Sequence, residues 1–286
     1  MNLKNYFKKA QRGKWAIGQF NFSTLSQLQG IVEAAKNLKS PIILGTSESE
    51  SRFMGLKQAV ALKNSFQKET GLPIFLNLDH GKSLDYIKKA IDLGYDMVHF
   101  DGSKLPLEEN IKKTIEVEKY AQKKGAVLEG EVGVIKTEAS KVYTEKFEIK
   151  EEDLTNPEEA AKYIDKTGVE CLAVSIGNFH GIEVTGVNPQ LKLDKLKEIK
   201  KKLGNVFFVL HGGSGTPDRD IKGAIKLGVV KVNINTELRL AYTNALRKAL
   251  GKEKEITPYK YLPDAIKAVQ KVVEEKIKLF GSKNKV

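Results

Sequence analysis

The chain has 286 residues, of which 41% are hydrophobic and 29% are charged, a composition typical of a folded globular protein rather than a disordered one. It contains no run of the roughly 18 apolar residues that a membrane span needs and no apolar segment of signal-peptide length near its N-terminus, so we expect a cytoplasmic protein with no membrane partner. The net charge of +12 is spread along predicted helix faces beside glutamates, a pattern that disfavours nucleic acid as a partner and leaves a mild attraction for phosphorylated substrates.

Strand-length runs of apolar and β-branched residues alternate along the chain with segments of helical periodicity. The predicted strands are residues 16–20, 41–45, 73–78, 97–100, 126–129, 171–176, 206–210 and 229–234. The predicted helices that follow them are residues 25–38, 56–69, 84–93, 107–124, 157–166, 193–203, 218–227 and 236–250. Eight strand-helix units predict an α/β fold, a single-domain (β/α)8 TIM barrel over residues 1–286.

Two further features complete this organisation. A final helix is predicted at residues 262–280, and its apolar face is expected to pack against the barrel or against a second subunit. We therefore expect a homodimer or homotetramer. Cys171, the only cysteine, lies in the sixth apolar run, so an intrachain disulfide is excluded and a buried core position is predicted.

Polar residues follow the predicted strands, at the end of the barrel where TIM-barrel active sites are built. Three of the four histidines lie there, His80, His180 and His211, and Asp79 directly precedes the first. His99 lies inside the fourth strand instead, and we interpret it as a packed, hydrogen-bonded barrel residue. The same rim carries Asn21, Ser23, residues 47–50, Asp101, Glu129, Glu131, Asn178 and residues 233–236.

Three neutral imidazoles with an open fourth position are a usual composition for catalytic zinc. We therefore predict a metal site made of His80, His180 and His211, with Asp79 free to carry protons. Asp101 and Glu131 are candidates for hydrogen-bond partners of these imidazoles or for an alternative metal position, and simple hydrogen bonding at the rim is the remaining interpretation.

A phosphate site is predicted separately from the metal site. Gly212-Gly213-Ser214-Gly215 follows the seventh strand, and Asn233-Ile234-Asn235-Thr236 follows the eighth, each at the start of a helix. Loops at these two places, with exposed backbone N–H groups and a helix N-terminus, form the recurring phosphate site of TIM barrels.

Six motifs in this order resemble those of the class II, metal-dependent fructose-bisphosphate aldolases, which have relatives that act on tagatose bisphosphate. The resemblance runs from about Phe20 to Ser282. The motifs are Leu78-Asp79-His80-Gly81, Phe100-Asp101-Gly102-Ser103, Leu128-Glu129-Gly130-Glu131-Val132-Gly133, Asn178-Phe179-His180-Gly181, Leu210-His211-Gly212-Gly213-Ser214-Gly215 and Val232-Asn233-Ile234-Asn235-Thr236-Glu237-Leu238-Arg239.

The resemblance implies cleavage of fructose 1,6-bisphosphate to dihydroxyacetone phosphate and glyceraldehyde 3-phosphate. One Zn²⁺ on His80, His180 and His211 would stabilise the enediolate as a Lewis acid, with a monovalent cation as a second candidate ion. Asp79 is implied as the acid/base on the hydroxyl of the aldehyde-derived carbon. Arg239 resembles an arginine that reaches the second phosphate, with a surface helix arginine as the alternative. The implied contacts to dihydroxyacetone phosphate are Gly181, Gly212, Gly213, Ser214, Asn233, Asn235 and Thr236.

Three departures from the family pattern bear on the substrate. Residues 182–186 read Ile-Glu-Val-Thr-Gly where many relatives have a lysine that helps to hold phosphate, so Val184 and Thr185 replace it and Glu183 adds a negative charge. Of an acidic pair that moves the carbon-bound proton in relatives, only Glu138 remains. Asn235 stands where fructose-specific members often have aspartate and tagatose-specific members alanine, which leaves the sugar stereochemistry open.

Other functions compete with this one. A Schiff-base aldolase needs a lysine inside a barrel strand, but the sixth strand has none, and we interpret Lys231 in the eighth as a strand-edge residue that points outward. A metal-dependent barrel hydrolase usually has two histidines on the first strand, and residues 16–20 contain none. The non-enzymatic alternative is a sugar-phosphate-binding barrel that has kept the metal ligands but lost efficient turnover.

Overall fold

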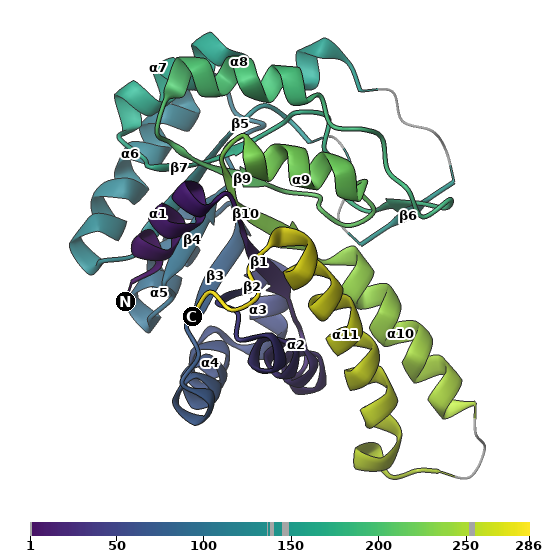
Figure 1. The fold of residues 1–286 in the computed structure, drawn as a ribbon. Coiled ribbons are helices and arrows are strands. Elements are labelled where there is room, and N and C mark those ends of the chain that lie inside the picture. Colours follow the sequence, from purple (N-terminus) through teal and green to yellow (C-terminus); the bar gives the residue numbers. More distant parts are fainter. Residues whose placement is uncertain (1, 136, 138–139, 145–148, 252–254) are drawn as a thin grey trace.

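The computed structural model describes residues 2–135, 137, 140–144, 149–251 and 255–286. Parallel strands form a closed barrel in the order β1-β10-β9-β7-β5-β4-β3-β2 (Figure 1). The strands are β1 Ile17–Asn21, β2 Ile42–Ser47, β3 Ile74–Gly81, β4 Met97–Phe100, β5 Val127–Val132, β7 Cys171–Val174, β9 Phe207–Leu210 and β10 Val229–Ile234. The predicted TIM barrel is therefore confirmed.

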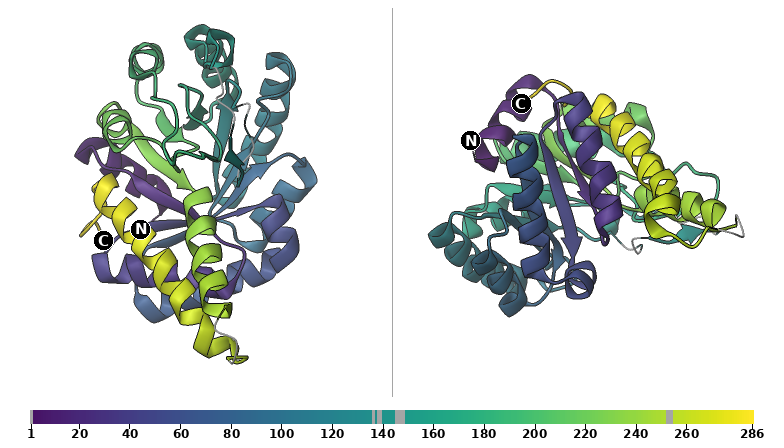
Figure 2. Two further views of the ribbon diagram at one scale, coloured as in Figure 1. Left: turned by 90° about the vertical axis from the view of Figure 1, so that its right-hand side faces the viewer. Right: turned by 90° about the horizontal axis from the view of Figure 1, so that it is seen from below.

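Helices pack around the outside of the barrel, as Figure 2 shows from two further directions. They include α2 Leu25–Leu38, α4 Leu56–Thr70, α5 Leu84–Leu93, α6 Leu107–Lys124, α7 Pro157–Thr167, α8 Leu193–Leu203, α9 Asp218–Lys226 and α10 Thr236–Leu250. Local residues set their ends. In α7, for example, the Asn156 side chain accepts hydrogen bonds from two N–H groups of the first turn, and Gly168 ends the helix in the left-handed conformation.

The structure contains short elements that the sequence analysis did not predict: α1 Leu3–Gly13, α3 Glu48–Met54, the 3-10 helix η1 Glu151–Asp153, and a small parallel sheet of β6 Val142–Tyr143 with β8 Ile182–Glu183. Helix α1 packs Leu3, Phe7 and Ala10 among buried residues of the barrel interior, which include Ile17 and Cys171. The predicted burial of Cys171 is confirmed. Apolar contacts thus close the N-terminal end of the barrel.

Polar side chains fill the next part of the barrel interior. Gln19, Asn77, His99, Glu129 and Lys231 are all fully buried. The Asn77 amide donates to Gln19 Oε1 at 2.8 Å, and Gln19 Nε2 donates to the Asn21 side-chain oxygen at 3.1 Å. Because hydrogen bonds between buried groups restrict side-chain rotation, these contacts hold Gln19, Asn21 and Asn77 in fixed orientations beneath the carboxyl ends of the strands.

The C-terminal helix α11 spans Pro258–Phe280 and begins before the predicted residue 262, because Pro258 already has the backbone angle of a first helical turn. It packs along α2 and α10 (Figure 1). At Gly30 of α2 a Cβ atom would lie only 2.6 Å from the carbonyl oxygen of Ile266, so the glycine permits this close crossing. None of the helices in the described ranges is long and apolar enough to cross a membrane.

Candidate active site

A pocket opens at the carboxyl ends of the barrel strands. Its walls come from β3, from the loop that follows β7, and from the ends of β9 and β10. All of its lining residues are among the predicted site residues: Asp79, His80, His180, Gly181, His211, Gly212, Ser214, Asn233, Asn235 and Thr236. The barrel therefore gathers the predicted metal, proton-transfer and phosphate residues at one place.

Asp79 and His80 lie within β3, whereas the sequence analysis ended this strand at residue 78. His80 has a left-handed backbone, with φ of 50°, and the pairing of β3 with β4 shifts register between Leu78 and Gly81. Neighbouring side chains of a regular strand point to opposite faces. The irregular backbone at His80 lets both neighbours line the pocket, and such backbone strain is common at functional sites.

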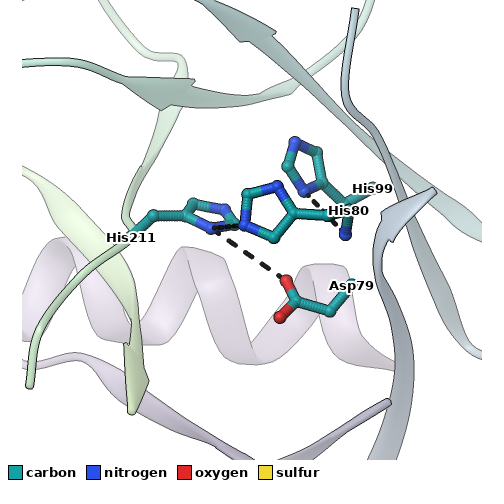
Figure 3. Close-up of side chains that lie close together, drawn as sticks. All are labelled: Asp79, His80, His99 and His211. Atoms are coloured by element: carbon teal, nitrogen blue, oxygen red, sulfur yellow. Dashed lines mark hydrogen bonds and ion pairs between the residues drawn. The ribbon is translucent and has the colours of Figure 1, made fainter. Parts of the chain in front are cut away.

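His80 and His211 face each other across the site (Figure 3), with His80 Nε2 3.0 Å from His211 Nδ1. The other nitrogen of each ring is hydrogen-bonded to a carboxylate: His80 Nδ1 lies 3.0 Å from Asp101 Oδ2, and His211 Nε2 lies 2.6 Å from Glu129 Oε1. A carboxylate accepts an N–H, so in the neutral rings the facing nitrogens would carry the lone pairs. At 3.0 Å the two nitrogens can share one proton, and imidazole nitrogens oriented by carboxylates also suit zinc.

His180 adjoins this pair from the loop after β7. Its ring centre lies 5.0 Å from that of His80 and 6.0 Å from that of His211. The loop after β5 holds it in place, because the His180 N–H donates to Thr137 Oγ1 at 2.7 Å and its Nδ1 lies 3.2 Å from the Thr137 carbonyl oxygen. The His180 ring thus lies beside the pair, but among the described residues it belongs to neither group of candidate ligands whose atoms lie within 4.8 Å of one another, and its assignment as a metal ligand stays a prediction.

The described residues include two groups of potential metal ligands, and within each group the ligand atoms lie within 4.8 Å of one another. One comprises Asp79, His80, His99 and His211, and the other comprises His80, Asp101 and Glu131. His99 is buried and its Nδ1 accepts the His80 backbone N–H at 3.2 Å, which confirms that it is a packed, hydrogen-bonded barrel residue. Glu131 Oε2 lies 3.0 Å from His99 Nε2. Asp101 and Glu131 are therefore close enough to act either as partners of the imidazoles or at an alternative metal position.

Two amide groups hold the Asp79 carboxylate. Its Oδ2 accepts from Asn21 Nδ2 at 2.9 Å, and its Oδ1 accepts from Asn233 Nδ2 at 3.1 Å while lying 4.0 Å from His211 Nδ1. Burial raises the pKa of Asp79, but nearby positive charge, chiefly that of His80, outweighs it and holds the pKa well below its usual value. The ionised carboxylate can accept a proton from a substrate hydroxyl.

The imidazoles differ in their proton affinity. Burial lowers the pKa of His80, but the charge of Asp79 and the hydrogen bond to Asp101 outweigh it and raise the pKa to about 9. Burial and the positive charge of His80 lower the pKa of His180 to about 3, and the same causes lower that of His211 well below its usual value. The site therefore favours one positive charge, which lies on the His80 ring.

The predicted outward orientation of Lys231 is wrong. Its side chain is fully buried inside the barrel, with Nζ 2.7 Å from Glu129 Oε2. Lys231 stands two residues before Asn233 in β10, and alternate residues of a strand face the same side, so this spacing was the signal that the sequence analysis missed. The ion-paired ammonium does not line the pocket, which gives a Schiff-base mechanism no support.

The two predicted phosphate loops, residues 212–215 and 233–236, are hydrogen-bonded to each other. Ser214 Oγ accepts from the N–H groups of Asn235 and Glu237, each at 3.3 Å, and the Gly213 N–H donates to the Asn233 carbonyl oxygen at 3.0 Å. The Gly213 N–H is thus already paired. The side-chain oxygens of Asn233 and Asn235 are buried without a hydrogen-bond partner, and they offer acceptors to substrate hydroxyl groups in the pocket that both residues line.

Arg239 lies outside the pocket lining, in the first turns of α10. Its guanidinium contacts Glu50 of α3 and the hydroxyl of Ser140. The Ser140 N–H in turn donates to Thr236 Oγ1 at 3.2 Å, which links Arg239 to the pocket wall. The arginine is therefore not an ordinary surface residue, although its contact with a phosphate stays a prediction.

The small sheet of β6 and β8 ties the loops after β5 and β7 together beside the pocket: the Ile182 N–H donates to the Lys141 carbonyl oxygen at 3.0 Å. Thr185, which takes part in the departure from the family pattern, is exposed just beyond β8. Glu138, the candidate acid/base of the loop after β5, lies outside the described residues.

The sequence predicts a place at the rim for Asn21 and Glu50, but no role for them or for Thr137. Asn21 joins Asp79 to Glu50, and Thr137 holds His180. These contacts cross between separate elements of the barrel, so spacing along the chain carries no signal for them.

Comparisons with known proteins agree with this site. Residues 1–285 match the family described as fructose-bisphosphate aldolase class-II. The fructose-bisphosphate aldolase of Geobacillus stearothermophilus is 36% identical over 289 residues, which cover 100% of this chain and 98% of that protein. The sulfofructosephosphate aldolase of Alkalicoccus urumqiensis is 37% identical over 287 residues, which cover 99% of this chain and 96% of that protein.

A solved structure of an aldolase has a similar fold. The YdjI aldolase of Escherichia coli K12 superimposes with a TM-score of 0.84 at 29% sequence identity, over 99% of this chain and 98% of that one. Agreement in sequence and in fold extends over nearly the whole length of each protein. The chain therefore belongs to the class II fructose-bisphosphate aldolase family.

Proposed function

We propose that the protein is a zinc-dependent lyase that cleaves, and in reverse forms, a ketose 1,6-bisphosphate, with fructose 1,6-bisphosphate as the first candidate. The products are dihydroxyacetone phosphate and glyceraldehyde 3-phosphate. The observation that carries this proposal is the pair of facing nitrogens, His80 Nε2 and His211 Nδ1, with the ionised Asp79 beside them. That arrangement suits one Zn²⁺ held by His80, His211 and His180.

When bound, zinc supplies a Lewis acid that polarises the ketone carbonyl and stabilises the charge of the enediolate left by cleavage. Asp79 takes the proton from the hydroxyl of the aldehyde-derived carbon, the O–H electron pair becomes the new carbonyl bond, and the carbon-carbon bond breaks. The electron pair of that bond stays on the ketone half, which takes up a proton at carbon to become dihydroxyacetone phosphate. In condensation Asp79 returns the proton. The amides of Asn21 and Asn233 fix its two oxygens for this transfer.

The ketone half of the substrate is proposed to lie against the loops after β9 and β10, with Gly181 beside them. The pocket lining supports contacts from Gly181, Gly212, Ser214, Asn233, Asn235 and Thr236. Because the sequence has no lysine at residues 182–186, backbone N–H groups and hydroxyls carry more of the phosphate binding.

The sulfofructosephosphate aldolase relative supports keeping a wider set of ketose phosphates as alternatives, among them tagatose bisphosphate. A sugar-phosphate-binding barrel without turnover is the non-enzymatic alternative. A homodimer or homotetramer, a cytoplasmic location and a monovalent cation stay predictions.

A panel of ketose mono- and bisphosphates, scored for release of dihydroxyacetone phosphate with and without a chelator, tests the proposal. We expect cleavage that is lost on removal of zinc and restored when zinc is added back. Cleavage that survives complete zinc removal would exclude the metal mechanism, and zinc binding without cleavage of any ketose phosphate would favour the binding protein.

A further inference from the structure

Glu50 and Arg239 form an ion pair between two separate elements of the barrel rim. Arg239 Nη2 of α10 donates to Glu50 Oε1 of α3, and Nη1 of the same guanidinium donates to the Ser140 hydroxyl. The Glu50 side chain is 5% exposed and that of Arg239 is 36% exposed. The acid is thus the buried member, and the arginine is the member that reaches solvent.

Contacts that do not involve Arg239 hold Glu50 in place. Its Oε2 accepts from the Ser47 N–H at 2.8 Å and from Asn21 Nδ2 at 3.1 Å. The Glu50 N–H donates back to Ser47 Oγ at 3.2 Å, which completes a capping box at the start of α3. Glu50 therefore stays in place whether or not Arg239 is beside it.

Each member of the ion pair is connected to a pocket residue through one bridging side chain or backbone group. Asn21 Nδ2 donates to both Glu50 Oε2 and Asp79 Oδ2, and Ser140 connects Arg239 to Thr236. Asp79 serves the hydroxyl of the aldehyde-derived half in the proposed reaction. In that reaction the far end of this half would lie beyond Asp79, on the side where Asn21 and Ser140 connect the pocket to Glu50 and Arg239.

The ion pair of Glu50 and Arg239 reduces the net positive charge at the far end of the site. Glu50 compensates the positive charge of Arg239, so the far end of the site has little net attraction for a second phosphate dianion. A phosphate on Arg239 would also lie close to a fixed carboxylate, and juxtaposed like charges weaken binding. An uncharged hydroxyl at the far end meets no such repulsion.

We propose that Glu50 is a specificity-determining residue that lowers the preference for a second phosphate, so that the protein cleaves ketose 1-phosphates with an uncharged far end as well as ketose bisphosphates. The inference rests on the proposed aldolase function. It adds a substrate class to that function and assigns the acceptance of this class to the negative charge of Glu50.

The variant Glu50→Gln tests this inference, because its amide oxygen can still accept from Ser47 and Asn21 while the side chain loses its charge and turns its NH2 group toward Arg239. The measured quantity is the ratio of kcat/KM for fructose 1,6-bisphosphate to kcat/KM for fructose 1-phosphate, on the zinc-loaded enzyme. Because one compensating charge is removed, we expect the ratio to rise about tenfold. A ratio that stays unchanged or falls would overturn the proposal.

Two further variants sharpen the test. Glu48→Gln is the matched control, since Glu48 lies on the same short helix but accepts from the N–H groups of Lys82 and Ser83; its ratio should stay at the wild-type value. In Glu50→Gln with Arg239→Met the rise should disappear, because the freed guanidinium is its source. Persistence of the rise without Arg239 contradicts the inference.

Binding separates this inference from the aldolase proposal. If no ketose phosphate is cleaved, the proposed function fails, but calorimetric Kd values for the same two sugar phosphates still report on Glu50. The ratio of affinities should then shift about tenfold toward the bisphosphate in Glu50→Gln, and an unchanged ratio would reject the role of Glu50 on its own.

Discussion

Lys231 Nζ and Glu129 Oε2 lie 2.7 Å apart inside the barrel, and both side chains are fully buried. The other oxygen of the same carboxylate lies 2.6 Å from His211 Nε2. One carboxylate therefore joins a buried ammonium to an imidazole of the candidate metal site. This arrangement makes the orientation of His211 depend on a lysine that never reaches the pocket.

Replacement of this lysine should weaken both the fold and the metal site. In Lys231→Met the Glu129 carboxylate stays buried without its cation, which is expected to cost about 3–5 kcal/mol in the free energy of unfolding. Zinc affinity should fall roughly 10- to 100-fold, because the partner that orients His211 is no longer held. Urea unfolding and competition with a zinc chelator measure the two effects.

The control for this variant is Lys63→Met. Lys63 is also buried and lies 3.1 Å from Asp96, away from the candidate site. It should lose stability but keep its zinc affinity. Equal zinc affinities in the two variants would show that Lys231 acts on stability alone.

Asp79 and His211 should separate proton transfer from metal binding. Asp79→Ala is expected to keep its zinc content near normal while turnover falls roughly 10²- to 10⁴-fold, since only the acid/base is removed. His211→Ala should lose both zinc and turnover. Zinc content by atomic absorption and an aldol-cleavage assay test this, and loss of zinc from Asp79→Ala as complete as from His211→Ala would refute the division of roles.

Asp101 should act through His80. Its Oδ2 lies 3.0 Å from His80 Nδ1, so Asp101→Ala leaves this ring without the partner that directs Nε2 toward His211. We expect zinc affinity to drop roughly 10- to 100-fold. Asp92→Ala, which removes a surface pair with Lys124, is the control and should bind zinc like the wild type. Equal affinities in both variants would leave Asp101 without this role.

Gly212 should resist even the smallest side chain. Its φ is 66°, and a Cβ atom would lie 2.2 Å from the carbonyl oxygen of Phe179. Gly168, with φ of 70°, has no atom within 4 Å of the same position, so Gly168→Ala meets only the backbone strain of about 1–3 kcal/mol. Gly212→Ala should be less stable than Gly168→Ala in thermal unfolding and should bind the substrate phosphate more weakly. Equal melting temperatures would contradict the close approach.

Much of the fold was predictable from the sequence because it depends on local patterns. Runs of strand length and helical periodicity predicted the barrel strands within a few residues, since burial in a TIM barrel imposes these patterns everywhere. Helix α1 was missed although Leu3, Tyr6, Phe7 and Ala10 have helical spacing, because its packing partners lie inside the barrel and far along the chain. The start of β3 was predicted well, but its end was not, because the left-handed backbone at His80 has no signature in residue type.

For the candidate site, the sequence alone determined that the residues lining the pocket share one rim, because parallel strands bring their carboxyl ends to the same end of the barrel. Only the tertiary structure decided what each residue contacts. It turned Lys231 inward onto Glu129, placed Glu50 against Arg239, and set His80 Nε2 opposite His211 Nδ1. The physical reason is that alternation along one strand fixes the side to which a side chain points. Its hydrogen-bond partner comes from another strand, and the closure of the barrel sets the distance between the two.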